Sequence, residues 1–171
     1  MRSEHESLRK LQAELARCLI GHDGSSGDCQ LQHLDKFDLD RSRETLLRKR
    51  ISQTRALLPK TAASLGTDFQ KWFREFADKH HFNGLHAISQ DTIAFAYWLS
   101  VKKTDRLWIG QLARWESIDC HWPLARTFIK FFRFEHDFSS YQRLDNPPVR
   151  KINCWCCVRF YGRFRKIKIL G

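Results

Sequence analysis

Three cysteines lie close together near the C-terminal end of the chain, at Cys154, Cys156 and Cys157. Clustered thiolates suit zinc, but a structural zinc ion takes four ligands, usually supplied as two short pairs on turns. These cysteines instead lie in a segment that alternates like a β-strand, which predicts Cys154 and Cys156 on its buried face and Cys157 on the opposite face. A buried free cysteine behaves as a small apolar side chain. We therefore favour packing over metal binding and predict no metal site in this chain.

The chain contains no arrangement of residues that is typical of a catalytic centre. It has no H-E-x-x-H pair, nucleophile elbow, phosphate-binding loop or glycine-rich dinucleotide turn. Cys120 and His121 are adjacent and are further candidates for metal ligands. His80, His81 and His86 are predicted to be solvated loop residues. We expect neither catalysis nor a cofactor of its own in this chain.

The strongest signal is the charge of the last fifty residues. Residues 122–171 hold 11 Lys and Arg against 3 Asp and Glu, a net charge of +8, whereas residues 1–121 hold 19 against 16, a net charge of +3. The same fifty residues carry 11 of the 22 aromatic residues. Such a surface can bind phosphates and stack on bases, or bind an acidic peptide that adds to a sheet edge. Lys and Arg also protect an edge strand from aggregation, so the residues alone leave three interpretations open.

Two predicted helices and a proline corner between them organise residues 46–76. On the first helix, one face is apolar and is predicted to be buried; it consists of Leu47, Ile51, Thr54 and Leu58. Another face repeats arginine every seven residues, as in a solvated surface, at Arg41, Arg48 and Arg55. Pro59 ends the first helix, and Gly66 is predicted to take a positive φ after a short helical turn.

Thr67 and Gln70 form a predicted capping box for the second helix. The broad apolar face of that helix consists of Phe69, Trp72, Phe73 and Phe76.

Three more helices are predicted around this corner. Residues 4–20 read as an amphipathic helix, Ser89 is a predicted cap of another, and Thr104 or Asp105 caps a third. The segment before the basic helix is predicted to be irregular and to contribute apolar side chains to the core, namely Leu31, Leu34 and Phe37. Asp38 or Asp40 would then cap the basic helix.

The chain turns to strand-like periodicity after Pro123. Residues 128–134 read as one strand and residues 152–160 as a second. Tyr161 and Gly162 form a predicted turn into a third strand, residues 163–170, with Ile167 and Ile169 facing inward and Arg165 outward. The predicted fold class is α+β, with an N-terminal all-α bundle of about five helices in residues 1–121 and a small basic antiparallel β-domain in residues 122–171.

The composition indicates a folded protein outside the membrane. Hydrophobic residues make up 42% of the chain, and no apolar run approaches the roughly 20 residues that span a bilayer. The first 15 residues are charged and amphipathic and lack the apolar core of a signal peptide. Six scattered cysteines do not suggest a disulfide framework. We expect a cytoplasmic protein with reduced thiols.

The order of several segments resembles a known bacterial family that is labelled a DNA-binding domain. These segments are LRKLQAEL, FDLDRSRETLLRKR, ALLPKTAASLG, DFQKWFREFA and IAFAYWL, and a branch of the family ends in a basic tail similar to NPPVRKINCWCCVRFYGRFRKIKIL. Better understood relatives are partner subunits of a TIM-barrel oxidase with a multinuclear iron centre. That pair modifies a cysteine in a ribosomally made precursor peptide, as in methanobactin-type and thiaglutamate-type pathways. The partner subunit is helical at its N-terminal end and carries a small β-domain that helps to hold the leader peptide.

The resemblance implies a non-catalytic partner subunit that forms a heterodimer with an iron-dependent oxidase, with the iron in the oxidase. Aromatic-rich helix surfaces would meet the oxidase. The residues predicted to bind the leader peptide are Trp155, Arg159, Arg163, Arg165 and Lys168. The alternative is a DNA- or RNA-binding regulator that uses the same basic surface, although the basic helix lacks the signature of a helix-turn-helix motif.

Overall fold

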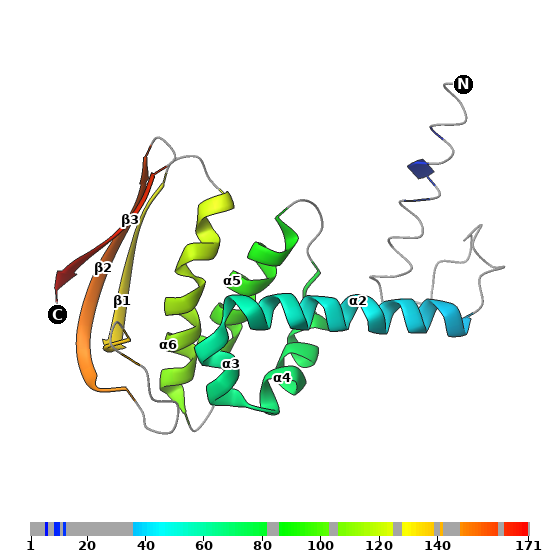
Figure 1. The fold of residues 1–171 in the computed structure, drawn as a ribbon, viewed down its shortest axis with the longest axis horizontal. Coiled ribbons are helices and arrows are strands. Elements are labelled where there is room, and N and C mark those ends of the chain that lie inside the picture. The colour runs from blue at the N-terminus through cyan, green and yellow to red at the C-terminus, as the bar shows by residue number, and fades with distance from the viewer. Residues whose placement is uncertain are drawn as a thin grey trace. The chain divides into compact units, whose positions relative to one another are not determined.

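The computed structural model confirms an α+β fold in which the helices precede the sheet (Figure 1). It describes residues 6, 9–10, 12, 36–81, 86–102, 106–124, 128–138, 141, 148–160 and 163–170. These residues include five α-helices: α2 (Lys36–Leu57), α3 (Pro59–Leu65), α4 (Asp68–Ala77), α5 (Ala87–Val101) and α6 (Leu107–Glu116). A 3₁₀ segment follows, η1 (Ser117–Leu124), and then three strands: β1 (Phe128–His136), β2 (Arg150–Phe160) and β3 (Arg163–Leu170).

The chain divides into two compact units, Met1–Lys49 and Arg50–Gly171. The second unit contains α3 to α6 together with the sheet. The boundary predicted between residues 121 and 122 lies inside this unit, where helices give way to strands, and stays a prediction. The helix predicted over residues 4–20 lies mostly outside the described residues, as do Leu31, Leu34, Thr104, Asp105 and the turn at Tyr161 and Gly162.

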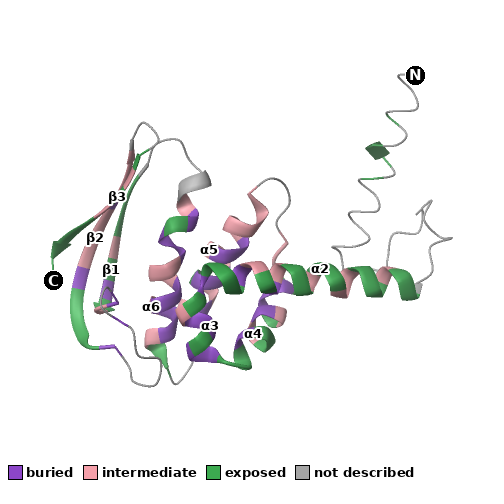
Figure 2. Ribbon diagram, viewed as in Figure 1, coloured by how far each residue is buried: buried purple, intermediate pink, exposed green. Residues whose placement is uncertain are grey.

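A cluster of phenylalanine rings forms the core of the helical part. Phe69, Phe73 and Phe76 of α4 and Phe95 of α5 are all at most 1% exposed, and their rings meet in edge-on or tilted pairs with centroids 5.0 to 5.5 Å apart. Each ring buries a large apolar area, and edge-on pairs add a further favourable term. The apolar face that the spacing predicts for α4 is therefore confirmed. Figure 2 shows the buried residues concentrated on α3 to α6.

The corner between the first two predicted helices is also confirmed. Helix α2 ends at Leu57 and α3 begins at Pro59, while Ile51, Thr54 and Leu58 are buried. Arg41, Arg48 and Arg55 are exposed, as predicted for a solvated face. Gly66 has a φ of +57° and a ψ of −123°, a backbone conformation that side chains with a Cβ rarely adopt.

Three predicted helix starts differ from the observed ones, and one predicted core residue is exposed. Helix α2 begins at Lys36, so Asp38 and Asp40 lie inside it rather than before it. Phe37 does not join the core, since it is 70% exposed. Thr67 makes no side-chain cap, because its own backbone is already helical (φ −66°, ψ −29°). Helix α5 begins at Ala87, two residues before the predicted cap at Ser89.

A carboxylate from a distant helix caps α3. Leu58 precedes α3 and has no side-chain acceptor, so the first backbone N–H groups need a partner from elsewhere. Glu116, the last residue of α6, accepts hydrogen bonds from the backbone N–H groups of Lys60 and Thr61, both at 2.8 Å, and from Thr61 Oγ1 at 2.7 Å. An anion at a helix N-terminus is favourable, and this contact joins the corner to the helix beneath the sheet.

Helices α5 and α6 pack closely at a glycine. A Cβ built on Gly110 would lie 2.5 Å from the Cα of Ser100 and 2.8 Å from the carbonyl oxygen of Leu99. No side chain fits there without a shift of the α5 backbone. Gly110 therefore sets the distance of α6 from α5.

The three strands form one antiparallel sheet in the order β1-β2-β3. One face of the sheet packs on α6 and η1 through a core of buried residues: Leu112, Ile118, Phe134, Phe138, Tyr141 and Cys157. Trp108, Trp115, Phe132, Trp155 and Phe164 pack against this core and are partly buried. We call this side of the sheet the inner face and the other side the outer face.

The predicted facing of β2 is wrong by one residue. Asn153 and Cys157 are buried and Trp155 packs on the core, whereas Cys154 and Cys156 are on the outer face. On β3 the inward facing predicted for Ile167 and Ile169 is wrong, since they are 52% and 55% exposed, whereas the outward facing predicted for Arg165 is confirmed. A shift of one residue moves every side chain of a strand to the other face. β2 carries apolar side chains on both faces, so its alternation alone is compatible with either face packing on α6. In the structure the face that carries Trp155 packs on the core.

No described helix is long and apolar enough to cross a membrane.

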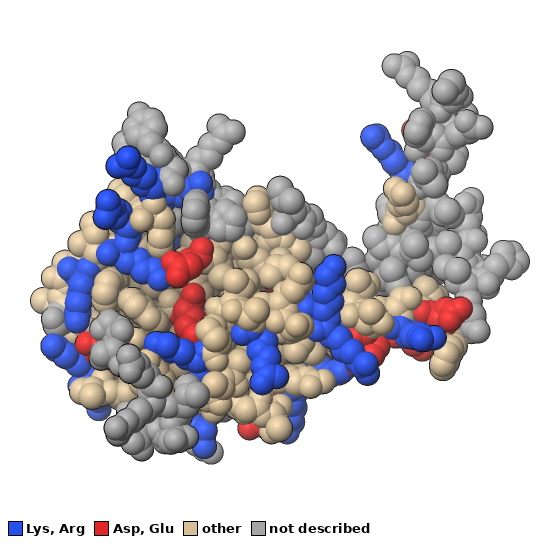
Figure 3. Space-filling model, viewed as in Figure 1, with Lys and Arg blue, Asp and Glu red and all other residues tan. Residues whose placement is uncertain are grey.

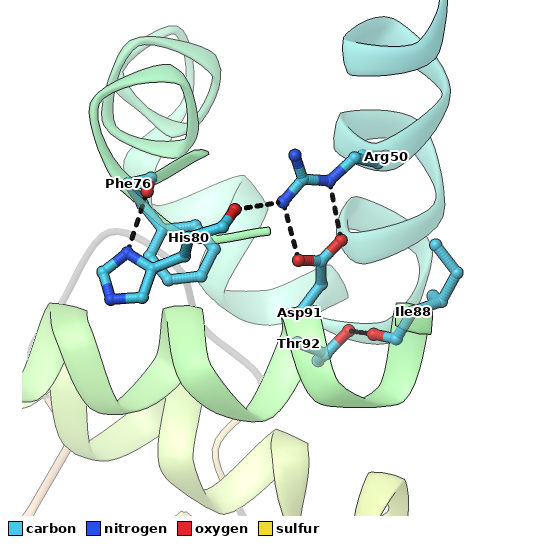
Figure 4. A network of polar contacts seen from close by, with 6 residues as sticks. All are labelled: Arg50, Phe76, His80, Ile88, Asp91 and Thr92. Carbon is cyan, nitrogen blue, oxygen red and sulfur yellow. Dashed lines mark hydrogen bonds and ion pairs between the residues drawn. The ribbon is translucent and has the colours of Figure 1, made fainter. Parts of the chain in front are cut away.

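An ion pair between Arg50, near the C-terminal end of α2, and the buried Asp91 joins that end of α2 to α5 (Figure 4). Arg50 donates from Nε to Oδ2 of Asp91 at 2.8 Å and from Nη2 to Oδ1 at 2.7 Å. The same Nη2 donates to the carbonyl oxygen of His80 at 2.9 Å, and the guanidinium carbon lies 5.7 Å from the centroid of the Phe73 ring. Asp91 is 1% exposed, so its charge depends on this bidentate partner.

Substitution of Asp91 by alanine is expected to lower the free energy of unfolding by about 3 kcal/mol, because it leaves the Arg50 guanidinium without its buried partner. The matched control is Glu44→Ala, which removes the partner of the exposed Arg48 at 2.8 Å and should change stability by less than about 0.5 kcal/mol. Urea denaturation followed by circular dichroism measures both. Equal effects of the two substitutions would show that the buried pair does not stabilise the fold.

Candidate functional site

The sheet register separates the five predicted peptide-binding residues onto two faces. Trp155 pairs with Lys168, and Arg159 pairs with Phe164, which places these residues on the inner face. Arg165 pairs with Val158, and Arg163 pairs with Phe160 at the start of β3, which places both arginines on the outer face. The structure therefore does not gather the five residues on one surface, and their role in peptide binding stays a prediction.

Trp155 packs against the core and is partly buried. Its ring centroid lies 4.7 Å from that of Trp115 on α6, at an interplanar angle of 58°. Trp115 in turn meets Phe134 of β1 edge-on, with centroids 5.7 Å apart. A ring held between a helix and the sheet contributes to packing, so Trp155 is poorly placed to stack on a ligand.

The lysines of β3 are held over the inner face. Lys166 Nζ lies 2.8 Å from Asp119 Oδ2 and 5.3 Å from the Trp115 ring centroid. Lys168 Nζ lies 3.5 Å from Asp137 Oδ2 and 5.9 Å from the Trp155 ring centroid. Partly exposed ion pairs of this kind add little stability, but together with the aromatic contacts they orient both ammonium groups toward η1 and the end of β1.

The outer arginines are accessible, and a third one joins them. Arg163 and Arg165 are exposed. Arg133 of β1 is also exposed and shares their face, because it pairs with Cys154. Figure 3 shows Lys and Arg side chains gathered over the part of the molecule where Figure 1 draws the sheet. Sequence reasoning missed Arg133, although the alternation of β1 contains the signal once the inner position of Phe134 is known.

The four cysteines that the structure describes also differ in burial. Cys154 and Cys156 are half-buried on the outer face, whereas Cys120 of η1 and Cys157 of β2 are buried. Burial raises the pKa of the Cys120 thiol to about 11, helped by the charge of Asp119, and burial likewise raises the pKa of Cys157 to about 11. Among the described residues, no group of three His, Cys, Asp or Glu side chains could hold a metal ion.

His80 is more buried than the prediction of a solvated loop residue implies, and His121, a candidate metal ligand, is also partly buried. His80 stacks on Phe76, with ring centroids 4.4 Å apart, and its Nδ1 lies 3.0 Å from the Phe76 carbonyl oxygen. His121 lies beside Lys130, with Nζ 3.1 Å from Nδ1. Burial, with a contribution from Lys130, lowers the pKa of His121 to about 4. His121 is therefore neutral at physiological pH and is not a proton switch there.

A known protein family matches the part of the chain that contains α2 to α5. Residues 10–101 match the family described as SCO6045-like, C-terminal domain. The match covers more than half of the chain, which therefore belongs to this family. It ends at the last residue of α5, so α6, η1 and the sheet lie outside the matched residues. No curated protein and no solved structure matches the chain significantly.

Alkylation of the native protein tests the facing of β2. Among the four described cysteines, we expect Cys154 and Cys156 to react with iodoacetamide at pH 8 before Cys120 and Cys157. Cys120 and Cys157 should stay unmodified until denaturant is added, because they are buried and their raised pKa values keep them as thiols. Peptide mapping by mass spectrometry measures each site, with the fully denatured protein as the control for intrinsic reactivity. Labelling of Cys157 as fast as Cys156 would contradict the observed register.

Proposed function

We propose that this chain is a non-catalytic partner subunit that binds a multinuclear iron oxidase and helps to recognise the precursor peptide that the oxidase modifies. The observation that carries the proposal is β3, a strand at the edge of a small sheet in which every charged residue is basic. Its eight residues include four cations, Arg163, Arg165, Lys166 and Lys168, and no acidic residue. The order of helices followed by a small sheet is also that of the partner subunits which the sequence resembles.

The edge of β3 suits an extended acidic peptide. None of the residues of β3 is buried (Figure 2), and β3 is hydrogen-bonded to β2 on one side only in the described sheet. A peptide that adds a fourth strand gains backbone hydrogen bonds, and its carboxylates meet the cations of β3. Such charge complementarity mainly speeds encounter and excludes wrong partners.

The oxidase is proposed to bind aromatic surfaces of the helices. Tyr97 of α5 is 62% exposed. Lys102 lies between two tryptophans, with Nζ 5.3 Å from the Trp72 ring centroid and 4.3 Å from that of Trp98. Aromatic side chains are enriched at protein interfaces. In this proposal the iron and the redox chemistry belong to the oxidase, and the complex acts in the cytoplasm.

Nucleic-acid binding is the second candidate, because the net charge of the last fifty residues is +8. Phosphate contacts alone give binding that weakens steeply with salt. Binding that survives about 0.5 M NaCl would therefore require contacts beyond phosphates and would favour a regulator that reads bases.

Purification of the tagged chain from its native host tests the proposed function. We expect a barrel-type oxidase and a small precursor peptide to co-purify, with iron in the eluate and a protein-like ratio of absorbance at 260 and 280 nm. Mass spectrometry identifies the proteins and the peptide. An iron-free eluate rich in nucleic acid and without a protein partner would contradict the proposal and favour the regulator.

A double charge reversal, Arg163→Glu with Arg165→Glu, should weaken binding of the recovered precursor peptide at least tenfold, because it turns attraction into repulsion at the edge of β3. The control is Arg55→Glu with Lys71→Glu, which changes the net charge equally at exposed helix positions. Anisotropy of the labelled peptide measures affinity, and circular dichroism checks the fold. Unchanged binding by a folded double variant would remove β3 as the peptide site.

A further inference from the structure

The outer face of the sheet is apolar in its middle and basic at two corners. The strand register arranges nine of its residues in three rows across the sheet: Ile129, Val158 and Arg165; Phe131, Cys156 and Ile167; and Arg133, Cys154 and Leu170. The middle row contains no charge, and the two arginines lie at diagonally opposite ends of the outer rows. This pattern defines a continuous apolar surface that crosses all three strands.

This surface is unusual for a three-stranded antiparallel sheet. Such a sheet normally buries one face and presents polar residues to water on the other. Here Phe131 is 73% exposed and Ile129 is 66% exposed, while α6 and η1 cover only the inner face. Contiguous exposed apolar patches with a polar rim mark interaction sites in folded proteins. The outer face therefore has the composition of an interface.

The charges of the outer face favour an acidic partner. The nine residues include two arginines and no Asp or Glu, and the exposed Arg163 follows at the end of β3. The acidic side chain at the end of β1, Glu135, lies 3.9 Å from Arg150. A partner that buries the middle row must bring acidic groups to the corners, since unpaired arginines lose solvation at the rim of an interface.

The outer face is about as wide as one α-helix. Three strands separated by about 4.8 Å give a surface about 10 Å across between the outer strands. One α-helix is about 10 Å in diameter and presents an apolar stripe bordered by polar residues. A single amphipathic helix would thus cover the middle row and place its flanking residues beside Arg133 and Arg165.

We propose that the outer face docks one amphipathic helix of a protein partner, with an apolar stripe on Phe131, Cys156 and Ile167 and acidic residues beside Arg133 and Arg165. The proposal goes beyond the capture of an extended peptide by β3 and does not depend on the identity of the oxidase. A second copy of this chain is a poorer occupant, because it would bring arginines against arginines. A nucleic acid is also poorer, because it cannot cover the apolar middle row.

Binding of three synthetic helical peptides of 18 residues tests this inference with the full chain. The first has a leucine stripe flanked by glutamates, the second replaces the glutamates by lysines, and the third replaces the leucines by serines. Fluorescence anisotropy at about 0.15 M NaCl should show binding of the first peptide, with affinity for the other two at least tenfold weaker, because each lacks one half of the required complementarity.

Substitution of Phe131 by serine should then weaken binding of the Leu/Glu peptide at least tenfold. Phe131 is already exposed, so the fold should survive, and Ile167→Ser provides a second variant on another strand. The matched control is Leu107→Ser, which removes a side chain of α6 that is 68% exposed and lies away from the outer face. Circular dichroism checks that each variant is folded.

The Phe131 variant also separates this surface from the edge site. A peptide added to the free edge of β3 would lie three strand spacings, about 14 Å, from β1 and should not respond to Phe131. The outer-face proposal would be overturned, and the edge site would stand, if two results were found together. These are loss of precursor binding in the Arg163 and Arg165 double variant and normal binding of the Leu/Glu peptide to the Phe131 variant.

The outer-face proposal also fails if the Leu/Glu peptide does not bind, if the lysine peptide binds equally well, or if sedimentation shows a dimer of this chain that the Phe131 variant abolishes.

Discussion

The contact between Trp115 of α6 and Trp155 of β2 determines which side of the sheet faces the helices. The two rings meet at 4.7 Å, and Phe134 and Cys157 complete the same layer. Because side chains alternate along a strand, placing Trp155 inward places Cys154 and Cys156 outward and aligns the neighbouring strands accordingly. The whole surface chemistry of the sheet therefore depends on the position of one large aromatic residue.

This constraint divides the positive charge of the sheet into two groups with different surroundings. Lys166 and Lys168 lie over the inner face beside Asp119, Asp137 and two tryptophan rings. Arg133, Arg163 and Arg165 lie on the outer face beside exposed apolar side chains. An edge that accepts an extended acidic peptide and an outer face that accepts an acidic helix would then be adjacent on one small sheet. A partner protein and a precursor peptide could be held at the same time.

The parts of the fold with strong local signals were predictable from the sequence. Pro59 and Gly66 mark the corner by their backbone restrictions, and the spacing of Phe69, Phe73 and Phe76 shows the buried face of α4. The order of helices and strands, and hence the fold class, follows from the change of period near residue 123. Helix caps were less predictable. The cap of α3 is Glu116, which is 56 residues away from Lys60, and Thr67 takes a helical backbone conformation despite its capping side chain.

The strands that carry the basic residues were predictable from the sequence, but the faces of the sheet were not. Because β2 carries apolar residues on both faces, its periodicity could not show which face packs on α6, and the role of the basic residues in binding stays a prediction. The register that brings Arg133 level with Cys154, and Arg165 level with Val158, depends on long-range pairing that local sequence does not encode. The ion pair of Arg50 with Asp91 was missed for the same reason, since its partners come from different helices.

The orientation of the sheet is tested most directly by nuclear Overhauser effects from the Trp115 indole in the isotope-labelled full chain. The account predicts cross-peaks from Trp115 to the Trp155 indole and to the Phe134 ring, and none to Ile167 or to the Cys156 Hβ protons. Cross-peaks from Trp115 to Ile167 and Cys156, with none to Trp155, would place the other face of β2 on α6. That result would contradict both the division of the charges and the outer face that follows from it.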